Sequence, residues 1–357
     1  GVGKTTVTTG LLGALSRLDS ENEYRVLQSR QARTPLVAAP HFSPRSLWTP
    51  PHHRLEQLAL PLELAPLGLD LLHSPDFIPP FYWPGASVIT VMDLAFLRFP
   101  YLLTADGKRY YGQIGRAVQR ADAILAISHS TKSDLITLLG APPDKITVTH
   151  LAADAHCRPV TDPARLAAVR QTYGLGDDFI LFLGTIEPRK DIASLLRAYS
   201  LLREKMADCR LVVAGRKGWL YQEVFDLAQT LNLGDAVRFI GGVAPDDLPA
   251  LYSAAQLFVL PSLYEGFGMP ILEAMACGAP VVCTNTSSLP EIAGDAALLV
   301  PPGDPAALAQ AIQRALTDEN LRRDLIQRGF RRAAGFSWEK TAQQTLEVYQ
   351  KAADRQQ

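Results

Sequence analysis

The chain has 357 residues, 47% of them hydrophobic, and a formal net charge of −1 from 35 basic and 36 acidic residues. This length exceeds that of one ordinary α/β domain and predicts two domains, each with its own core. The balanced charge excludes a field that would attract nucleic acid or an anionic membrane, so an anionic ligand must be bound by a few placed groups.

The chain starts at Gly1, in a segment that predicts a glycine-rich turn followed by a helix up to residue 17. We expect a first strand to lie upstream of this turn. The stretch 33–80 is rich in proline and histidine and predicts loops around short strands. Ser130 is the expected N-cap of a helix. The other elements expected before residue 150 are strands at 88–91, 123–127 and 146–149 and a helix at 106–121.

Pro159 to Pro163 mark a break that we interpret as the linker between the two domains. Beyond it, strands alternate with helices, which predicts a parallel sheet with right-handed crossovers. The expected strands are 179–184, 210–215, 237–240, 257–260, 280–283 and 297–300. The expected helices are 191–204, 219–231, 246–254, 269–277 and 304–317. Because ligands bind beyond the carboxyl ends of such strands, the loops that follow them are the candidates for a site.

The four cysteines show no CxxC spacing and no pairing with nearby histidines, which favours a reduced cytoplasmic protein without a metal site. No apolar run approaches the roughly 18–20 residues that a membrane-spanning helix needs. Peripheral contact with the cytoplasmic face of a membrane stays open as an alternative. The aromatic residues of 77–83 either line a groove for a substrate or belong to a folded loop.

The segment 261–276 follows a strand and opens a helix. Gly266 and Gly268 let backbone amides approach a ligand, and Pro270 suits a first helical turn, so the segment predicts an anion site fit for a diphosphate. Glu265 and Glu273 repel phosphate but accept hydrogen bonds from hydroxyl groups, such as those of a ribose and a sugar. The alternative is that both glutamates only complement a helix end.

A second cluster, Arg189 and Lys190, follows the strand at 179–184. Cations just past a strand end are suited to neutralise a pyrophosphate leaving group. The alternative is a solvated helix start. Gly215 ends the next strand. The segment that follows it either lines a ligand-binding cleft or forms an ordinary turn, and the sequence favours neither.

These segments resemble the retaining glycosyltransferases of family 4, also described as glycosyl transferases group 1. The resemblance covers nearly the whole chain and is clearest in GTIEPRK, LVVAGRKGW and LFVLPSLYEGFGMPILEAMACGAPVV. It implies the GT-B fold, an α/β architecture with two Rossmann-like, doubly wound domains that face a central cleft. Residues 1–160 would form the acceptor-side domain and 161–337 the nucleotide-sugar-binding domain, and the helix in 338–357 would cross back to the N-terminal domain.

The resemblance also implies the reaction. A hexose, with mannose as a candidate, would pass from a GDP- or UDP-linked donor to a glycan or lipid-linked acceptor, without metal or other cofactor. Lys190 and Arg189 would bind the donor phosphates, Glu265 the sugar hydroxyls and Glu273 the ribose. Glu265, Lys190 and Arg189 are the catalytic candidates. The remaining donor-binding candidates are Gly3, Asp93, Gly184, Thr185, Gly215, Val243, Gly266, Phe267, Gly268, Met269 and Pro270.

Two positions depart from the pattern of many relatives, which carry histidine at Met92 and arginine at Thr185. One alternative is therefore a catalytically weak or inactive member that binds nucleotide sugar or acts in assembly. Another is a P-loop NTPase, because residues 1–6, GVGKTT, resemble the end of the motif GxxxxGK[ST].

Overall fold

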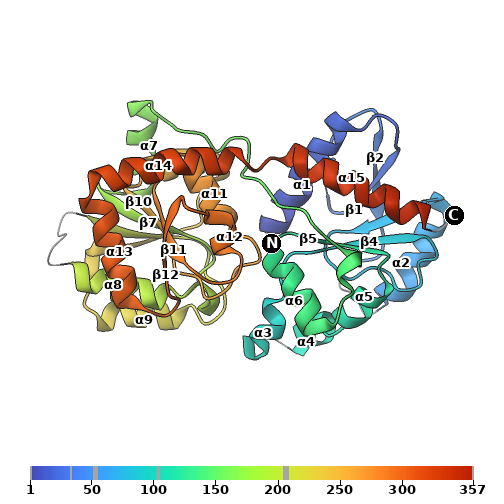
Figure 1. Cartoon of the computed structure of the whole chain (residues 1–357), viewed down its shortest axis with the longest axis horizontal. Helices are drawn as coiled ribbons and strands as arrows, with labels where there is room; N and C mark the ends of the chain where they lie inside the picture. The colour runs from blue at the N-terminus through green and yellow to red at the C-terminus, as the bar shows by residue number, and fades with distance from the viewer. Residues whose placement is uncertain (1, 33, 51–54, 103–104, 204–208, 356–357) are drawn as a thin grey trace. The chain divides into compact units, whose positions relative to one another are not determined.

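The structure is a computed structural model that describes residues 2–32, 34–50, 55–102, 105–203 and 209–355. Only the backbone is described for residues 2–5, 102, 105 and 106. The chain forms two compact units (Figure 1), the first from Gly1–Leu151 with Ser337–Gln357 and the second from Ala152–Phe336. Among the described residues, no helix combines the length and the apolar character needed to cross a bilayer.

The first unit contains a parallel four-stranded sheet of order β3-β4-β5-β6 and a separate parallel pair, β1-β2. Its strands are β1 (Tyr24–Ser29), β2 (Phe42–Leu47), β3 (Leu71–Ser74), β4 (Ala86–Val91), β5 (Ala123–Ala126) and β6 (Ile146–Val148). Its helices are α1 (Val2–Leu18), α2 (Glu56–Leu64), α3 (Ala95–Arg98), α4 (Ala105–Tyr111), α5 (Ile114–Arg120), α6 (His129–Leu139) and α15 (Trp338–Asp354).

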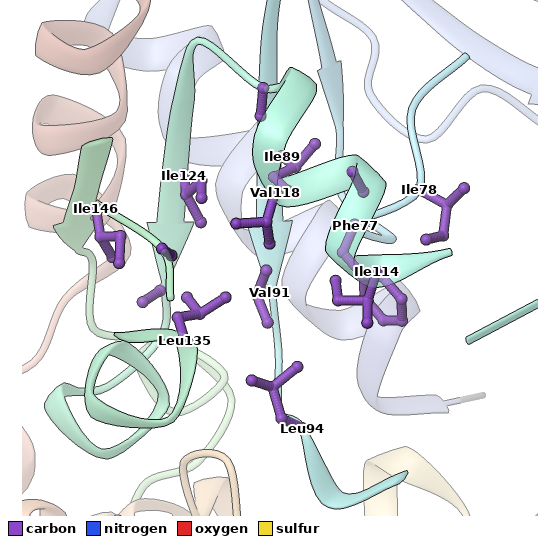
Figure 2. Close-up of a cluster of buried hydrophobic side chains, with 14 of the residues drawn as sticks. Phe77, Ile78, Ile89, Val91, Leu94, Ile114, Val118, Ile124, Leu135 and Ile146 are labelled. Atoms are coloured by element: carbon purple, nitrogen blue, oxygen red, sulfur yellow. The ribbon is translucent and has the colours of Figure 1, made fainter. Parts of the chain in front are cut away.

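One core of this unit lies between the sheet and the helices α5 and α6. Four of its side chains are fully buried and point toward one another (Figure 2): Ile89 and Val91 on β4, Ile124 on β5 and Leu135 on α6. β4 is buried along its whole length, so its β-branched run behaves as a strand covered on both faces.

The last helix, α15, belongs to the first unit. It lies beside α1 (Figure 1), where a Cβ atom on Gly10 would come within 2.4 Å of the Trp338 ring. His73 at the end of β3 bridges Tyr349 on α15 (Nδ1 to Oη 2.6 Å) and Thr90 on β4 (Nε2 to Oγ1 2.7 Å). Burial lowers the pKa of His73 to about 4, so the ring is neutral and ties the helix to the sheet.

The second unit is one parallel six-stranded sheet of order β12-β11-β10-β7-β8-β9. Its strands are β7 (Phe179–Leu183), β8 (Arg210–Ala214), β9 (Val237–Gly241), β10 (Leu257–Leu260), β11 (Val281–Thr284) and β12 (Ala297–Val300). Its helices are α7 (Pro163–Tyr173), α8 (Ile192–Leu202), α9 (Gln222–Thr230), α10 (Leu248–Ala254), α11 (Met269–Ala276), α12 (Leu289–Ala293), α13 (Pro305–Thr317) and α14 (Glu319–Ala334). The expected doubly wound α/β architecture is confirmed.

Four details differ from the sequence-based expectations. α1 already begins at Val2, so Gly3 lies in a helical turn rather than in a glycine-rich loop. The helix expected at 106–121 is two helices, α4 and α5. Ser128, not Ser130, caps α6, because its Oγ accepts the Thr131 N–H at 3.0 Å. The stretch 33–80 also contains α2, whose internal proline, Pro61, had suggested a loop.

The boundary between the units falls after Leu151 rather than near residue 160. The reason lies in the contacts of the segment that follows. The Val160 N–H donates to Ser253 Oγ at 3.0 Å, which attaches this segment to α10 of the second unit. The proline-rich break at 159–163 therefore leads into α7 and does not separate the units.

Candidate functional site

The strand order of the second unit reverses between β7 and β10, which are neighbours in the sheet. In open α/β sheets the loops at such a switch point form the crevice where ligands bind. Here these loops are 184–191 and 261–268, and the Leu263 N–H donates to the Arg189 carbonyl at 2.8 Å to join them. The two segments singled out in the sequence are thus in direct contact.

A buried ion cluster lies where the two loops meet. Lys190 Nζ is 2.5 Å from Glu265 Oε1, and Arg189 Nη1 is 3.1 Å from Glu265 Oε2. The Ser262 hydroxyl donates to Oε1 at 2.6 Å. Only 8% of Lys190 and 6% of Glu265 is exposed. Both carboxylate oxygens of Glu265 are therefore occupied within the second unit.

The charge state of Glu265 follows from this cluster. Burial by itself would raise the pKa of Glu265, but the ion pairs with Lys190 and Arg189 and the hydrogen bonds outweigh it and lower the pKa to about 2. Glu265 is therefore ionised at neutral pH and acts as a hydrogen-bond acceptor. A general acid would need a pKa near the working pH, so Glu265 is unsuited to that role.

Glu187 is a member of the cluster that the sequence analysis missed. Its Oε1 accepts from Arg189 Nη2 at 2.9 Å and from Nε at 3.1 Å, and 4% of the residue is exposed. Burial raises the pKa of Glu187, while Arg189 and Lys190 act in the opposite direction. Its position two residues before Arg189 is the sequence feature from which its role in the cluster could have been predicted. Two cations and two carboxylates make the cluster neutral as a whole.

Backbone geometry explains two of the glycines. Gly268 precedes α11 with φ of 97°, and Gly215 after β8 has φ of 150°, values that side chains disfavour. A Cβ atom on Gly215 would lie 1.8 Å from the Gly184 carbonyl oxygen. The backbones that follow β7 and β8 are therefore so close that position 215 has no room for a side chain.

Two serines of the β11–α12 loop shape the glycine loop, and neither was predicted. The Glu265 N–H donates to Ser287 Oγ at 2.8 Å. The Ser288 hydroxyl lies 2.9 Å from both the Glu265 and the Phe267 carbonyl oxygens. The backbone N–H of Glu265 therefore already donates to a side chain. The predicted anion site depends instead on the backbone amides of the residues that follow Glu265.

Glu273 lies on α11 and is separate from the ion cluster. Its Oε2 accepts from the hydroxyl of Tyr252 on α10 at 2.8 Å, and burial raises the pKa of Glu273. Tyr252 is fully buried and was not predicted as part of the site. The two glutamates thus have different environments, as different roles require.

The remaining candidates are distributed over both units. Thr185 and Val243 follow β7 and β9, and Met269 and Pro270 form the first turn of α11. Gly3 lies in α1 and Asp93 follows β4, so both belong to the first unit. Asp93 Oδ1 accepts the N–H of Ala95, the first residue of α3, at 2.9 Å.

Two family models match the chain. The one described as "Glycosyltransferase Family 4" matches residues 6–156, and "Glycosyl transferases group 1" matches 169–332. O-antigen chain mannosyltransferase B of Escherichia coli is 39% identical over 282 residues, 78% of this chain and 74% of that protein. Serotype-specific mannosyltransferase WbdA of E. coli is 36% identical over 253 residues, 70% of this chain but only 31% of its own length.

Solved structures show the same fold. Sucrose-phosphate synthase from Thermosynechococcus elongatus superposes with a TM-score of 0.78 at 24% identity, covering 98% of this chain and 93% of that one. WaaG, a glycosyltransferase involved in lipopolysaccharide biosynthesis, gives 0.74 at 20% identity, with 99% and 95% covered.

Proposed function

The chain belongs to the glycosyltransferases of family 4, the glycosyl transferases group 1, and from this membership we propose that it transfers mannose from a nucleoside-diphosphate sugar to a glycan or lipid-linked acceptor with retention of configuration. The names of the E. coli relatives, both mannosyltransferases, support mannose as the sugar. Membership in this family argues against the P-loop NTPase alternative.

The observation that carries the proposal is the buried contact of Lys190 and Arg189 with Glu265 at the switch point of the sheet. A diphosphate beside this cluster would accept hydrogen bonds from its two cations, with Arg189 offering a fork of donors and Lys190 a point charge. Glu265 Oε2, which accepts one hydrogen bond from Arg189, would accept a second from a sugar hydroxyl. Stabilisation of the departing diphosphate is then the largest contribution of the protein to the rate.

Retention follows without a protein nucleophile in this proposal. Both oxygens of Glu265 already bind Lys190, Arg189 and Ser262, so this carboxylate is engaged rather than free to attack the sugar. The acceptor hydroxyl attacks the anomeric carbon on the face that the diphosphate leaves. The bond to the diphosphate breaks as the new glycosidic bond forms, and a phosphate oxygen takes the hydroxyl proton.

Incubation with GDP-mannose, UDP-glucose and UDP-galactose, each with a mannose-terminated acceptor, tests the sugar and the reaction together. We expect mannosyl transfer, with the anomeric configuration of the donor kept in the product by NMR. Transfer from a UDP-hexose alone would contradict mannose. Binding of nucleotide without turnover of any donor would favour the inactive member instead.

Transfer should survive chelation of divalent metals. In the described structure Glu187 and Glu265 balance the charges of Lys190 and Arg189, but these two cations are the groups that would donate hydrogen bonds to the leaving diphosphate in place of a metal ion. Initial rates with and without EDTA measure this directly. Loss of activity on chelation, restored by Mn²⁺ or Mg²⁺, would show that the leaving group depends on a metal.

Replacement of Glu273 with alanine should weaken binding of the nucleoside diphosphate by about 1.5–3 kcal/mol, because a ribose hydroxyl would lose a charged acceptor. Tyr252→Phe removes the hydroxyl that holds Glu273 Oε2 and should cause a smaller loss. Glu319→Ala, an exposed glutamate in the first turn of α14, is the control. Titration calorimetry measures all three, and unchanged affinity in Glu273→Ala would return this residue to a structural role.

A further inference from the structure

Helix α2 of the first unit is apolar on two opposite faces. Leu60 and Leu64 pack into a small hydrophobic core and attach the helix to the unit. Leu55, Leu58 and Leu62 follow the i, i+3, i+7 spacing of the other face, and they are 57%, 60% and 76% exposed. We call these three residues the leucine stripe. A contiguous apolar stripe in contact with water marks a surface that binds something.

Two exposed aromatic residues lie on either side of α2. Glu63 Oε1 accepts the N–H of Trp48 at 2.5 Å, and Gln57 Oε1 accepts the N–H of Phe81 at 2.8 Å, which places Tyr82 beside the helix as well. Positions 57 and 63 are about 120° apart around a helix of 3.6 residues per turn, so the two aromatic residues flank the leucine stripe. Trp48 is 71% exposed and Tyr82 is 60% exposed.

An exposed arginine lies over each of these two rings. The Cζ atom of Arg30 is 3.4 Å from the centroid of the Trp48 ring, and that of Arg116 on α5 is 5.6 Å from the centroid of the Tyr82 ring. Both oxygens of Glu63 accept backbone N–H groups, which ties this carboxylate to the chain after β2. The borders of the leucine stripe therefore combine aromatic rings with positive charges.

We propose that the leucine stripe, with Trp48 and Tyr82 at its borders, is the surface by which the protein binds a lipid bilayer that contains anionic lipids. The leucines would enter the boundary between headgroups and acyl chains. Trp and Tyr keep an apolar ring at that depth and a polar tip in water, and the guanidinium groups of Arg30 and Arg116 donate to lipid phosphates. The use of this surface, access to a lipid-linked acceptor, rests on the proposed function.

A bilayer fits this surface better than a protein does. A specific protein contact buries roughly 800 Å² on each partner, whereas the stripe is one side of a helix of nine residues. A fluid bilayer surrounds protruding side chains without a matching surface of its own. Glu56 and Glu63 are half-buried on the same helix and offset the charges of Arg30 and Arg116, so the leucines should contribute more to binding than the arginines.

Sedimentation of the full chain with vesicles of phosphatidylglycerol and phosphatidylethanolamine tests the surface. We expect saturable binding and a blue shift of tryptophan emission, most of which Trp48→Phe should remove. Leu58→Gln combined with Leu62→Gln should weaken binding by roughly tenfold or more, and Arg30→Gln by roughly fivefold. Leu201→Gln is the matched control, because Leu201 is a 59% exposed leucine on α8 of the second unit, and it should bind vesicles as the parent does.

Unchanged vesicle affinity in the double leucine variant, or an unshifted emission spectrum, would overturn the proposal. So would a dimer in sedimentation velocity that this variant abolishes while the parent ignores vesicles, since the stripe would then bind a second copy. The variant changes exposed side chains, so it should melt with the parent; if it unfolds, Trp48→Phe and Arg30→Gln decide.

Transfer separates this surface from the proposed function. The double leucine variant should use a soluble glycan acceptor at the rate of the parent and a lipid-linked acceptor in vesicles more slowly. If mannose is transferred but vesicles are not bound, the membrane surface alone fails. If vesicles are bound but no donor is used, the surface stands and the proposed function fails.

Discussion

Lys190→Ala is expected to lower the rate of transfer by roughly 100-fold or more, the effect of removing one preorganised electrostatic contact. The structure adds a second consequence. Lys190 is buried against Glu265, with Nζ 2.5 Å from Oε1, so its loss leaves a buried carboxylate with Arg189 as its remaining cation. Breaking one side of such a pair costs up to about 3–5 kcal/mol, and the melting temperature should fall as well.

A double variant separates the two effects. Lys190→Met combined with Glu265→Gln removes both charges, which restores much of the stability because no unpaired charge stays buried. Transfer should nevertheless stay low. Lys351→Ala, an exposed lysine in the last turn of α15, controls for the change in net charge. Initial rates are measured below the melting temperature of Lys190→Ala. Near-normal transfer in this variant would mean that Arg189 and Lys190 belong to a helix start and do not bind the donor.

Glu265→Gln should have the opposite effects on binding and on transfer. Glutamine keeps the size of the side chain but releases Lys190 and Arg189 from their carboxylate partner. The nucleoside diphosphate should therefore bind as well as before or better, while transfer falls by roughly 100-fold because the acceptor for the sugar hydroxyls is weakened in the transition state.

Calorimetry with the diphosphate, beside initial rates, measures both quantities for Glu265→Gln. Glu273→Ala provides the comparison, since it should lose diphosphate affinity. An equal loss of affinity in the two variants would mean that the roles of the two glutamates are wrongly assigned. Unchanged transfer in Glu265→Gln would remove Glu265 from the catalytic centre.

The sequence was most informative where the site is contiguous. The glycine loop with Glu265 and the cations Arg189 and Lys190 each follow a recognisable strand, and a parallel sheet brings such loops to one edge. Tyr252 and Ser288 could not be found in this way. They reach the site only because α10 and the β11–α12 loop pack beside α11, and no local pattern distinguishes them from other buried polar residues.

In the first unit, prolines inside a helix and a strand made these two elements difficult to predict from the sequence. Pro61 lies inside α2 and Pro44 inside β2, positions where proline removes a backbone donor and usually ends an element. Packing overrides this tendency, since Leu64 of α2 is fully buried in a small core with Leu72 and Trp83. Gly3 was placed in a turn for a similar reason, because glycine is permissive and not diagnostic.

The docking of α15 determines the order in which the chain can fold during synthesis. Every residue of the second unit leaves the ribosome before α15 does, so this unit can complete its sheet while the first is still open. Domains usually fold from the N-terminus onward. Here the first unit is complete only after α15 has been synthesised, because Trp338 packs on Gly10 and Tyr349 binds His73. Until then the faces that α15 covers stay exposed, and a nascent chain stalled before residue 337 would be prone to aggregate.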